Sequence, residues 1–121
     1  MKKALLSSLF LLLLAGCTTD KYAWNNYDDK LYAYYKNPHE VEQFAAHLKE
    51  TIALGEKTNN LPPGIYAEYG YLLYEMQNFS EAIVYFDKER ARFPESQFLM
   101  ARMIDNSQKM IDKNQIIVIS Q

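Results

Sequence analysis

Apolar residues recur every three or four positions along most of this chain, with polar residues between them, as they do in amphipathic α-helices. The pattern is clearest over residues 63–94, where two such runs follow one another. Gly70 and Ala82 are small enough to let two antiparallel helices approach closely. The large residues that would fill the seam between them are Tyr66, Leu73, Phe79 and Phe86. The stretch therefore predicts one helical hairpin.

Capping and helix-breaking residues set the expected ends of the helices. Asn78 and Glu81 have the spacing of a capping box, which predicts the start of the second helix of the hairpin. Pro94 blocks the continuation of that helix. A further helix start is predicted at residues 37–40, with Asn37 as the cap, Pro38 at the first helical position and Glu40 closing the capping box. This helix is expected to reach about residue 56.

The helix expected before Asn37 is rich in aromatic residues. Large apolar and aromatic residues recur in it at helical spacing, at Trp24, Tyr27, Leu31 and Tyr34. One interpretation is that this helix packs its aromatic residues on the next one. The other is that Tyr22 and Trp24 lie in the headgroup region of a membrane, where Trp and Tyr are enriched.

Two segments end the chain. Residues 95–112 predict a terminal helix of the kind that caps an array of helical repeats. A polar break at residues 113–115 separates this helix from Ile116–Ile119, an apolar run of β-forming residues. The tail over residues 113–121 either frays or packs on the helices, or it adds a strand to the sheet of a partner protein. The chain is thus expected to be all-α, with about five helices over residues 24–112.

The central hairpin also resembles the tetratricopeptide repeat. Counted from Pro63, the positions that match the pattern of that repeat are Tyr66, Gly70, Leu73, Phe79, Ala82, Phe86 and Pro94. Tyr69 and Glu89 depart from it, because the pattern has Leu and a small residue there. The resemblance implies tetratricopeptide-like antiparallel helix hairpins, with the core repeat at residues 63–96.

The same resemblance suggests a partner-binding face. In repeats of this kind the first helix of each pair lines a concave groove, which makes Ala67, Tyr71, Tyr74 and Glu75 the candidate partner-binding residues. Tyrosine gives a large contact area with little loss of conformational entropy. The alternative is that Tyr71 and Tyr74 only extend the core.

The N-terminus has the organisation of a secretion signal. Met1–Lys3 is basic, and Ala4–Leu14 is an apolar run too short to span a bilayer. The following Leu14–Cys17 resembles the lipobox of bacterial lipoproteins. That resemblance implies a signal peptide over residues 1–16, diacylglycerol on the Cys17 thiol, acylation of the new amino terminus, and a lipidated tether over residues 17–23.

The residue after Cys17 bears on localisation. In enteric-type bacteria an aspartate at this position retains lipoproteins in the inner membrane, whereas this chain has Thr18. The resemblance therefore implies the outer membrane, with the protein lipid-anchored and facing the periplasm. Three acyl chains would give permanent anchoring, because two already bind stably. The alternative is that Cys17 is a buried or disulfide-bonded cysteine. Cys17 is the only cysteine of the chain, so an internal disulfide is excluded.

The charge balance argues against nucleic acid as a partner. The chain has 13 Lys and Arg against 15 Asp and Glu, a net charge of −2. Removal of the signal peptide takes away Lys2 and Lys3, which leaves eleven basic residues against fifteen acidic ones, a formal charge of −4. Phosphate backbones are bound by basic patches, and no basic stripe is present in the sequence.

Catalytic chemistry has little support in the sequence. His39 and Glu42, three residues apart, could place two metal ligands on one face of a helix, so a small metal-dependent enzyme is the alternative function. The sequence has no nucleophile motif and no phosphate-binding glycine loop. We therefore expect a non-enzymatic protein without metal or cofactor.

The layout of the whole chain resembles an uncharacterised family of small bacterial outer-membrane lipoproteins. The shared features are the lipobox, an aromatic first helix, Asn37–Pro38, and the segments LPPGxYAEYGYLL and FxKExAxFPES. Members are typically encoded beside lipoproteins resembling the curli secretion channel. The resemblance implies a membrane-tethered protein–protein interaction module, an accessory subunit or pilotin-like factor of an outer-membrane export complex, with such a channel lipoprotein as a candidate partner.

Overall fold

The computed structural model describes residues 21–120 of the 121-residue chain. Regular structure in this part is entirely helical. In chain order the elements are α2 (Tyr27–Lys36), the 3-10 helix η1 (Pro38–Glu40), α3 (Val41–Thr58), α4 (Ile65–Glu75), α5 (Phe79–Arg92), the 3-10 helix η2 (Pro94–Ser96) and α6 (Gln97–Ile119). The prediction of an all-α chain with about five helices is confirmed over the described residues. The expected signal peptide (1–16) and Cys17 lie outside them.

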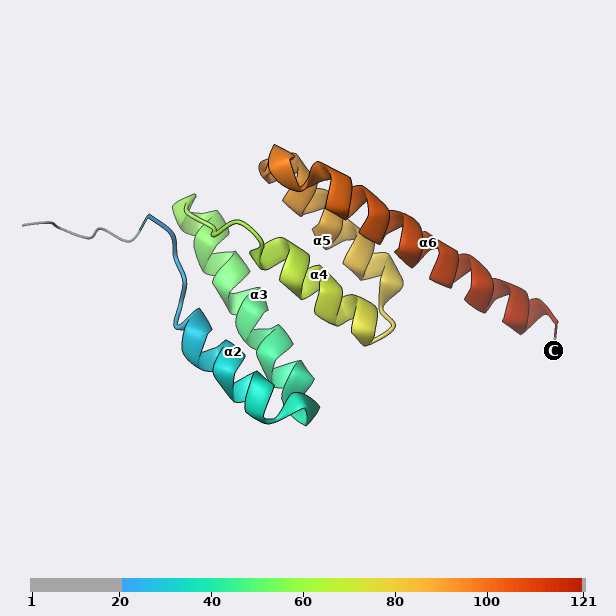
Figure 1. Ribbon diagram of the computed structural model, residues 1–121, viewed down its shortest axis with the longest axis horizontal. Helices are drawn as coiled ribbons and strands as arrows, with labels where there is room; N and C mark the ends of the chain where they lie inside the picture. Colours follow the sequence, from blue (N-terminus) through green and yellow to red (C-terminus); the bar gives the residue numbers. More distant parts are fainter. Residues whose placement is uncertain (1–20, 121) are drawn as a thin grey trace, which may run out of the picture.

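The helices stack in chain order, each antiparallel to the one before it (Figure 1). Contacts are concentrated between sequence neighbours: α2 with α3, α3 with α4, α4 with α5, and α5 with α6. A stack in which each helix packs mainly on its neighbours leaves both outer helices with an uncovered side. In this protein those outer helices are α2 and α6.

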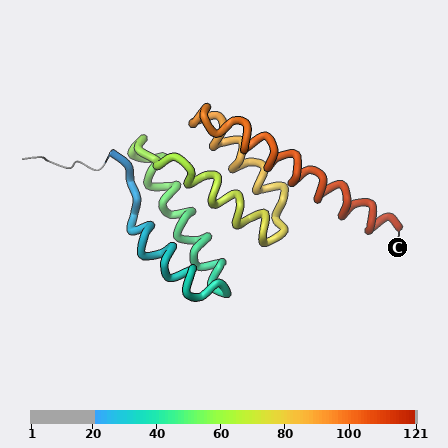
Figure 2. The backbone as a smooth tube through the Cα atoms, in the orientation of Figure 1, coloured from blue at the N-terminus to red at the C-terminus, as the bar shows by residue number. Residues whose placement is uncertain are grey.

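The stack has two edges where the chain turns. One edge holds residues 21–25, the α3–α4 loop, the end of α5 and the start of α6, and we call it the Trp24 edge (Figure 2). The other holds the α2–α3 and α4–α5 connections and the end of α6, and we call it the Ile119 edge. The first described residue and the end of α6 therefore lie on opposite edges.

The core lies between α3, α4 and α5, and all the residues predicted to fill the central seam are buried. These are Tyr66, Gly70, Leu73, Phe79, Ala82 and Phe86. A methyl group added at Gly70 would lie 2.8 Å from Cε1 of Phe86. Gly70 is therefore required because the Phe86 ring of α5 occupies the space of a side chain on α4.

A buried acid holds the beginning of α4. Glu89 of α5 is only 2 % exposed. Its carboxylate accepts hydrogen bonds from the backbone N–H of Gly64 at 2.8 Å and of Ala67 at 3.4 Å. The first N–H groups of a helix have no intrahelical acceptor, so Glu89 caps α4 from the neighbouring helix.

Two local predictions of helix starts are wrong in detail. The Asn37 side chain makes no cap hydrogen bond, and residues 38–40 form η1 before α3 begins at Val41. The first turn is closed instead by the backbone, where the Glu40 N–H donates to the Asn37 carbonyl at 2.9 Å. At α5 the Asn78 side chain donates to Glu81 at 2.7 Å rather than accepting from the helix backbone.

The predicted break at residues 113–115 is wrong, because α6 continues through it to Ile119. The β-type run at residues 116–119 is therefore helical. No proline or glycine interrupts α6, and the pairs Lys109–Asp105 at 2.6 Å and Gln108–Asp112 at 2.9 Å have the i,i+4 spacing that supports a helix. No helix among residues 21–120 is both long and apolar enough to cross a membrane.

Candidate functional site

A hollow between α4 and α6 is the main concave feature near the predicted partner-binding residues. It encloses about 290 Å³. Its lining consists of Ala67, Glu68, Tyr71, Phe86, Leu99, Met100 and Met103. We call this the α4–α6 groove. Phe86 and Met100 are buried and form its floor, whereas Tyr71 is 49 % and Leu99 is 59 % exposed. Its exposed surface is thus apolar and aromatic.

The structure brings three of the four predicted partner-binding residues together. Ala67 and Tyr71 line the α4–α6 groove. Glu75 is exposed one helical turn after Tyr71. Hydrogen bonding to Glu75, together with its negative charge, raises the pKa of the Tyr71 hydroxyl. These three residues therefore form one continuous surface on α4.

Tyr74 is placed differently. It does not line the groove, and its ring packs edge-to-face on the ring of Phe79 with 5.1 Å between the centroids. Tyr74 is half-buried against the hydrophobic core. It therefore extends the core at the α4–α5 turn, which is the alternative that the sequence left open for it.

The groove also contains residues that the sequence reasoning did not select. Leu99 and Met103 come from α6, and Glu68 from α4. Leu99 and Met103 are four residues apart, and Met100 and Met103 are three apart, so all three lie on one side of α6. That spacing was the available signal in the sequence, but only the packing of α4 and α6 on α5 places this face opposite Tyr71.

Glu68 connects the groove to α2. The Tyr27 hydroxyl donates a hydrogen bond to Oε2 of Glu68 at 2.6 Å. Burial raises the pKa of Glu68, and the hydrogen bond from Tyr27 opposes that rise. Burial and the neighbouring carboxylate also raise the pKa of Tyr27. This bond therefore links two helices, α2 and α4, that are not neighbours in the sequence.

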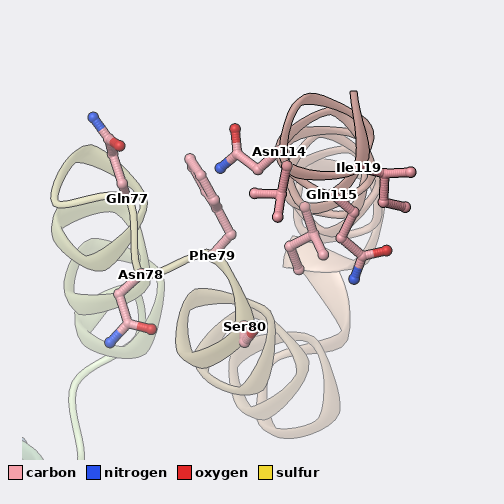
Figure 3. A pocket seen from close by; sticks show the side chains of 9 residues that line it. Gln77, Asn78, Phe79, Ser80, Asn114, Gln115 and Ile119 are labelled. Carbon is pink, nitrogen blue, oxygen red and sulfur yellow. The ribbon is translucent and has the colours of Figure 1, made fainter. Parts of the chain in front are cut away.

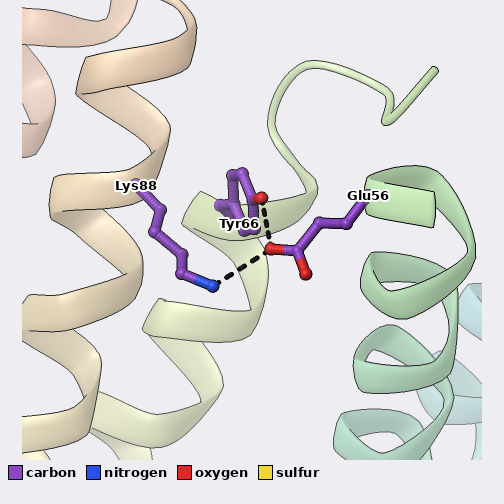
Figure 4. A network of polar contacts seen from close by, with 3 residues as sticks. All are labelled: Glu56, Tyr66 and Lys88. Carbon is purple, nitrogen blue, oxygen red and sulfur yellow. Dashed lines mark hydrogen bonds and ion pairs between the residues drawn. The ribbon is translucent and has the colours of Figure 1, made fainter. Parts of the chain in front are cut away.

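A second network joins α3 to the central hairpin (Figure 4). The Tyr66 hydroxyl and the Lys88 ammonium both donate to Oε1 of Glu56, at 2.6 and 3.0 Å. These two bonds hold the pKa of Glu56 below its usual value. The Lys88 Nζ also lies 5.4 Å from the centroid of the Tyr66 ring. The network links α3, α4 and α5, and none of its three residues lines the α4–α6 groove.

A larger cavity lies on the Ile119 edge (Figure 3). It has a volume of about 470 Å³. Its lining comes from the α4–α5 turn, with Gln77, Asn78, Phe79 and Ser80, and from α6, with Ile111, Asn114, Gln115, Val118 and Ile119. It exists because α6 extends past the beginning of α5. The predicted tail is thus one wall of an open, largely apolar hollow.

The candidate metal ligands are not brought into a cluster. His39 lies in η1 and Glu42 in the first turn of α3, and both are exposed. Within residues 21–120 no three His, Cys, Asp or Glu side chains are grouped so that they could hold a metal ion.

Comparison with known proteins adds one finding. No curated protein and no solved structure matches the chain. The sequence pattern of the family described as "Domain of unknown function (DUF4810)" matches residues 21–103. The match runs from the segment before α2 to Met103 in α6, and it includes the complete lining of the α4–α6 groove. Since the match covers more than half of the chain, the protein belongs to this uncharacterised DUF4810 family.

Proposed function

We propose that this protein is a lipid-anchored protein–protein interaction module at the periplasmic face of the outer membrane. In this role it is an accessory subunit or pilotin-like factor of an export complex, and it holds its partner in the α4–α6 groove. The observation that carries the proposal is the groove itself, in which exposed Tyr71 and Leu99 stand over a buried floor. Aromatic and apolar anchors around a desolvated pocket are the usual source of binding energy in protein interfaces.

The anchoring part of the proposal rests on the sequence. Leu14–Cys17 resembles a lipobox, and Thr18 replaces the aspartate that would retain a lipoprotein in the inner membrane. Three acyl chains on Cys17 would keep the module at the membrane without a transmembrane helix. A lipoprotein of the curli-secretion-channel type is the partner that we propose.

Site-specific photocrosslinking in living cells tests the groove. A photoreactive amino acid at Tyr71 should give an adduct with a discrete partner protein. The same amino acid at Lys49, an exposed residue of α3 outside the groove, should not. Leu99→Asp should abolish the Tyr71 adduct by placing a charge in the groove. Val84→Asp is the matched control, because Val84 is similarly exposed but lies on α5 outside the groove. Equal crosslinking from Tyr71 and Lys49 would contradict the proposed binding surface.

Cell fractionation tests the anchor separately. Cys17→Ala should leave the protein unprocessed or remove it from the outer membrane. If the variant is still processed and still fractionates with outer membranes, the anchoring proposal is wrong, whatever the crosslinking shows.

A further inference from the structure

The Trp24 edge is held together by hydrogen bonds between segments that are distant in the sequence. The Ala23 N–H donates to the Asn60 carbonyl at 3.0 Å, which fixes the chain before α2 to the α3–α4 loop. Arg92, at the end of α5, donates to Oδ1 of Asn59 at 3.2 Å. The point where the N-terminal segment reaches the folded body is therefore a defined position on this edge.

Aromatic rings with cationic neighbours recur along the Trp24 edge. Lys21 Nζ lies 5.1 Å from the Tyr22 ring, and the guanidinium carbons of Arg92 and Arg102 each lie 5.9 Å from an aromatic ring. The last two rings are those of Phe93 and Phe98. Two large hydrophobic side chains of this edge are exposed to solvent, Trp24 at 42 % and Phe98 at 76 %.

Such a surface matches the interface of a bilayer. Trp and Tyr are enriched at the headgroup level because their rings are apolar at one end and polar at the other. Lys and Arg beside them can keep their charges among lipid phosphates while their stems cover apolar surface. Exposed acidic residues lie beside these rings as well: Asp28 and Asp29 line a hollow together with Trp24, and Glu95 belongs to η2. The main attraction to the bilayer is therefore aromatic contact and not net charge.

The length of chain outside the described residues limits the distance to the membrane. Lys21 is four residues after Cys17, and four extended residues reach at most about 14 Å. The headgroup region on one side of a bilayer is itself roughly 5 to 8 Å thick. If Cys17 carries acyl chains, Tyr22 and Trp24 must therefore lie close to the lipid surface.

We propose that the Trp24 edge sits in the headgroup region of the bilayer that anchors Cys17, with Trp24 and Phe98 in contact with lipid. The inference rests on the anchoring part of the proposed function. It orients the whole stack, since the Ile119 edge then points away from the membrane (Figure 1). The cavity lined by Phe79 and Val118 would face the periplasm.

The fluorescence of Trp24 tests this orientation directly, because Trp24 is the only tryptophan of the chain. The full-length acylated protein is purified from membranes and reconstituted in vesicles of phosphatidylethanolamine and phosphatidylglycerol. We expect the Trp24 emission to shift to the blue, to be quenched by brominated phospholipids, and to lose its quenching by aqueous acrylamide. The unacylated Cys17→Ala protein in buffer gives the reference for Trp24 in the absence of lipid, where its side chain is 42 % exposed.

Two variants move the single tryptophan, the fluorescent reporter, to other positions on the same fold. Trp24→Phe combined with Phe98→Trp keeps the reporter on the Trp24 edge and should reproduce the blue shift and the quenching by brominated lipid. Trp24→Phe combined with Val118→Trp places it at the end of α6, where acrylamide should quench it fully. Protection at position 118, or water exposure at both 24 and 98 in the vesicle-bound protein, would overturn the inference.

Mass spectrometry of the N-terminal peptide distinguishes a failure of the proposed anchor from a failure of the proposed orientation. Absence of acyl chains on Cys17 would overturn the proposed anchor and this orientation with it. Acylated Cys17 with a water-exposed Trp24 would overturn the orientation alone. Binding of the partner in the α4–α6 groove is measured independently by the crosslinking from Tyr71.

Discussion

The Glu89 carboxylate accepts a hydrogen bond from the Gly64 backbone N–H at 2.8 Å, so a side chain of α5 caps the start of α4. Gly64 has a φ of 92°, in the left-handed region that favours glycine, and its own residue type offers no capping side chain. Glu89 stands where the tetratricopeptide pattern has a small residue. The carboxylate explains why Glu89 departs from the pattern, because the start of α4 needs a hydrogen-bond acceptor and the residues just before it supply none.

Removal of this cap should destabilise the protein. We expect Glu89→Ala to lower the free energy of unfolding by about 1–3 kcal/mol, since it leaves the partly buried N–H groups of Gly64 and Ala67 without their acceptor. Glu50→Ala, on an exposed surface of α3, should change it by less than about 0.5 kcal/mol. Urea unfolding of both variants provides the comparison. Equal effects of the two substitutions would show that Glu89 is not a cap of this kind.

The same residue should make stability depend on pH. Burial raises the pKa of Glu89, against the lowering effect of its backbone hydrogen bonds. Above about pH 4.3 the unfolded chain loses this proton while the folded chain still holds it, so stability falls as pH rises through the raised pKa. Glu56, whose hydrogen bonds lower its pKa, acts in the opposite sense and loses its contribution as pH falls below about 4.3.

The comparison of the wild type with Glu89→Gln isolates the effect of Glu89. Glutamine does not titrate, so the stability of the wild type relative to the variant should be greatest below about pH 4.3 and should decrease as the pH rises from there through the raised pKa of Glu89. Urea unfolding at a series of pH values measures this difference. A difference that stays constant across the range would contradict the raised pKa.

Close packing of α4 on α5 gives a prediction at Gly70. Gly70→Ala should cost about 1–3 kcal/mol, because the added methyl group would lie 2.8 Å from Cε1 of Phe86 and 3.3 Å from the Ala82 carbonyl oxygen. Phe86→Leu removes the ring atoms and should make the same Gly70→Ala change less costly. A double-mutant cycle measured by urea unfolding gives the coupling between the two positions. Additive effects would mean that Phe86 does not limit the space at Gly70.

The two tyrosines of α4 should separate binding from stability. Tyr71→Ala should keep stability within about 0.5 kcal/mol of the wild type and should weaken capture of the partner, because Tyr71 is exposed in the groove. Tyr74→Ala should lower stability, since it removes an edge-to-face contact with Phe79 that is typically worth about 0.5–1.5 kcal/mol beyond its buried area. Thermal melts and partner capture, measured on both variants, distinguish the two roles. If the Tyr71→Ala variant unfolds, Tyr71 is part of the core and not of an exposed binding surface.

The sequence alone determined the helical class and the packing of the central hairpin. Periodic apolar positions and small residues such as Gly70 and Ala82 are local signals, and the structure buries them as the pattern predicts. Membership of an uncharacterised family was also predicted from sequence segments and is confirmed. Local signals were less accurate at Asn37 and at residues 113–115, because a polar residue is compatible with a cap, a loop or the exposed face of a helix.

Only the tertiary structure decided which residues meet across the stack. Glu89 caps α4, Leu99 stands opposite Tyr71, and Tyr27 binds Glu68, each from a different helix. The apolar pattern of a helix fixes which face is buried, but it does not fix the height or the angle at which the next helix packs. Those quantities depend on how the side chains of both helices fit together, and they determine here that Tyr71 lines the groove while Tyr74 belongs to the core.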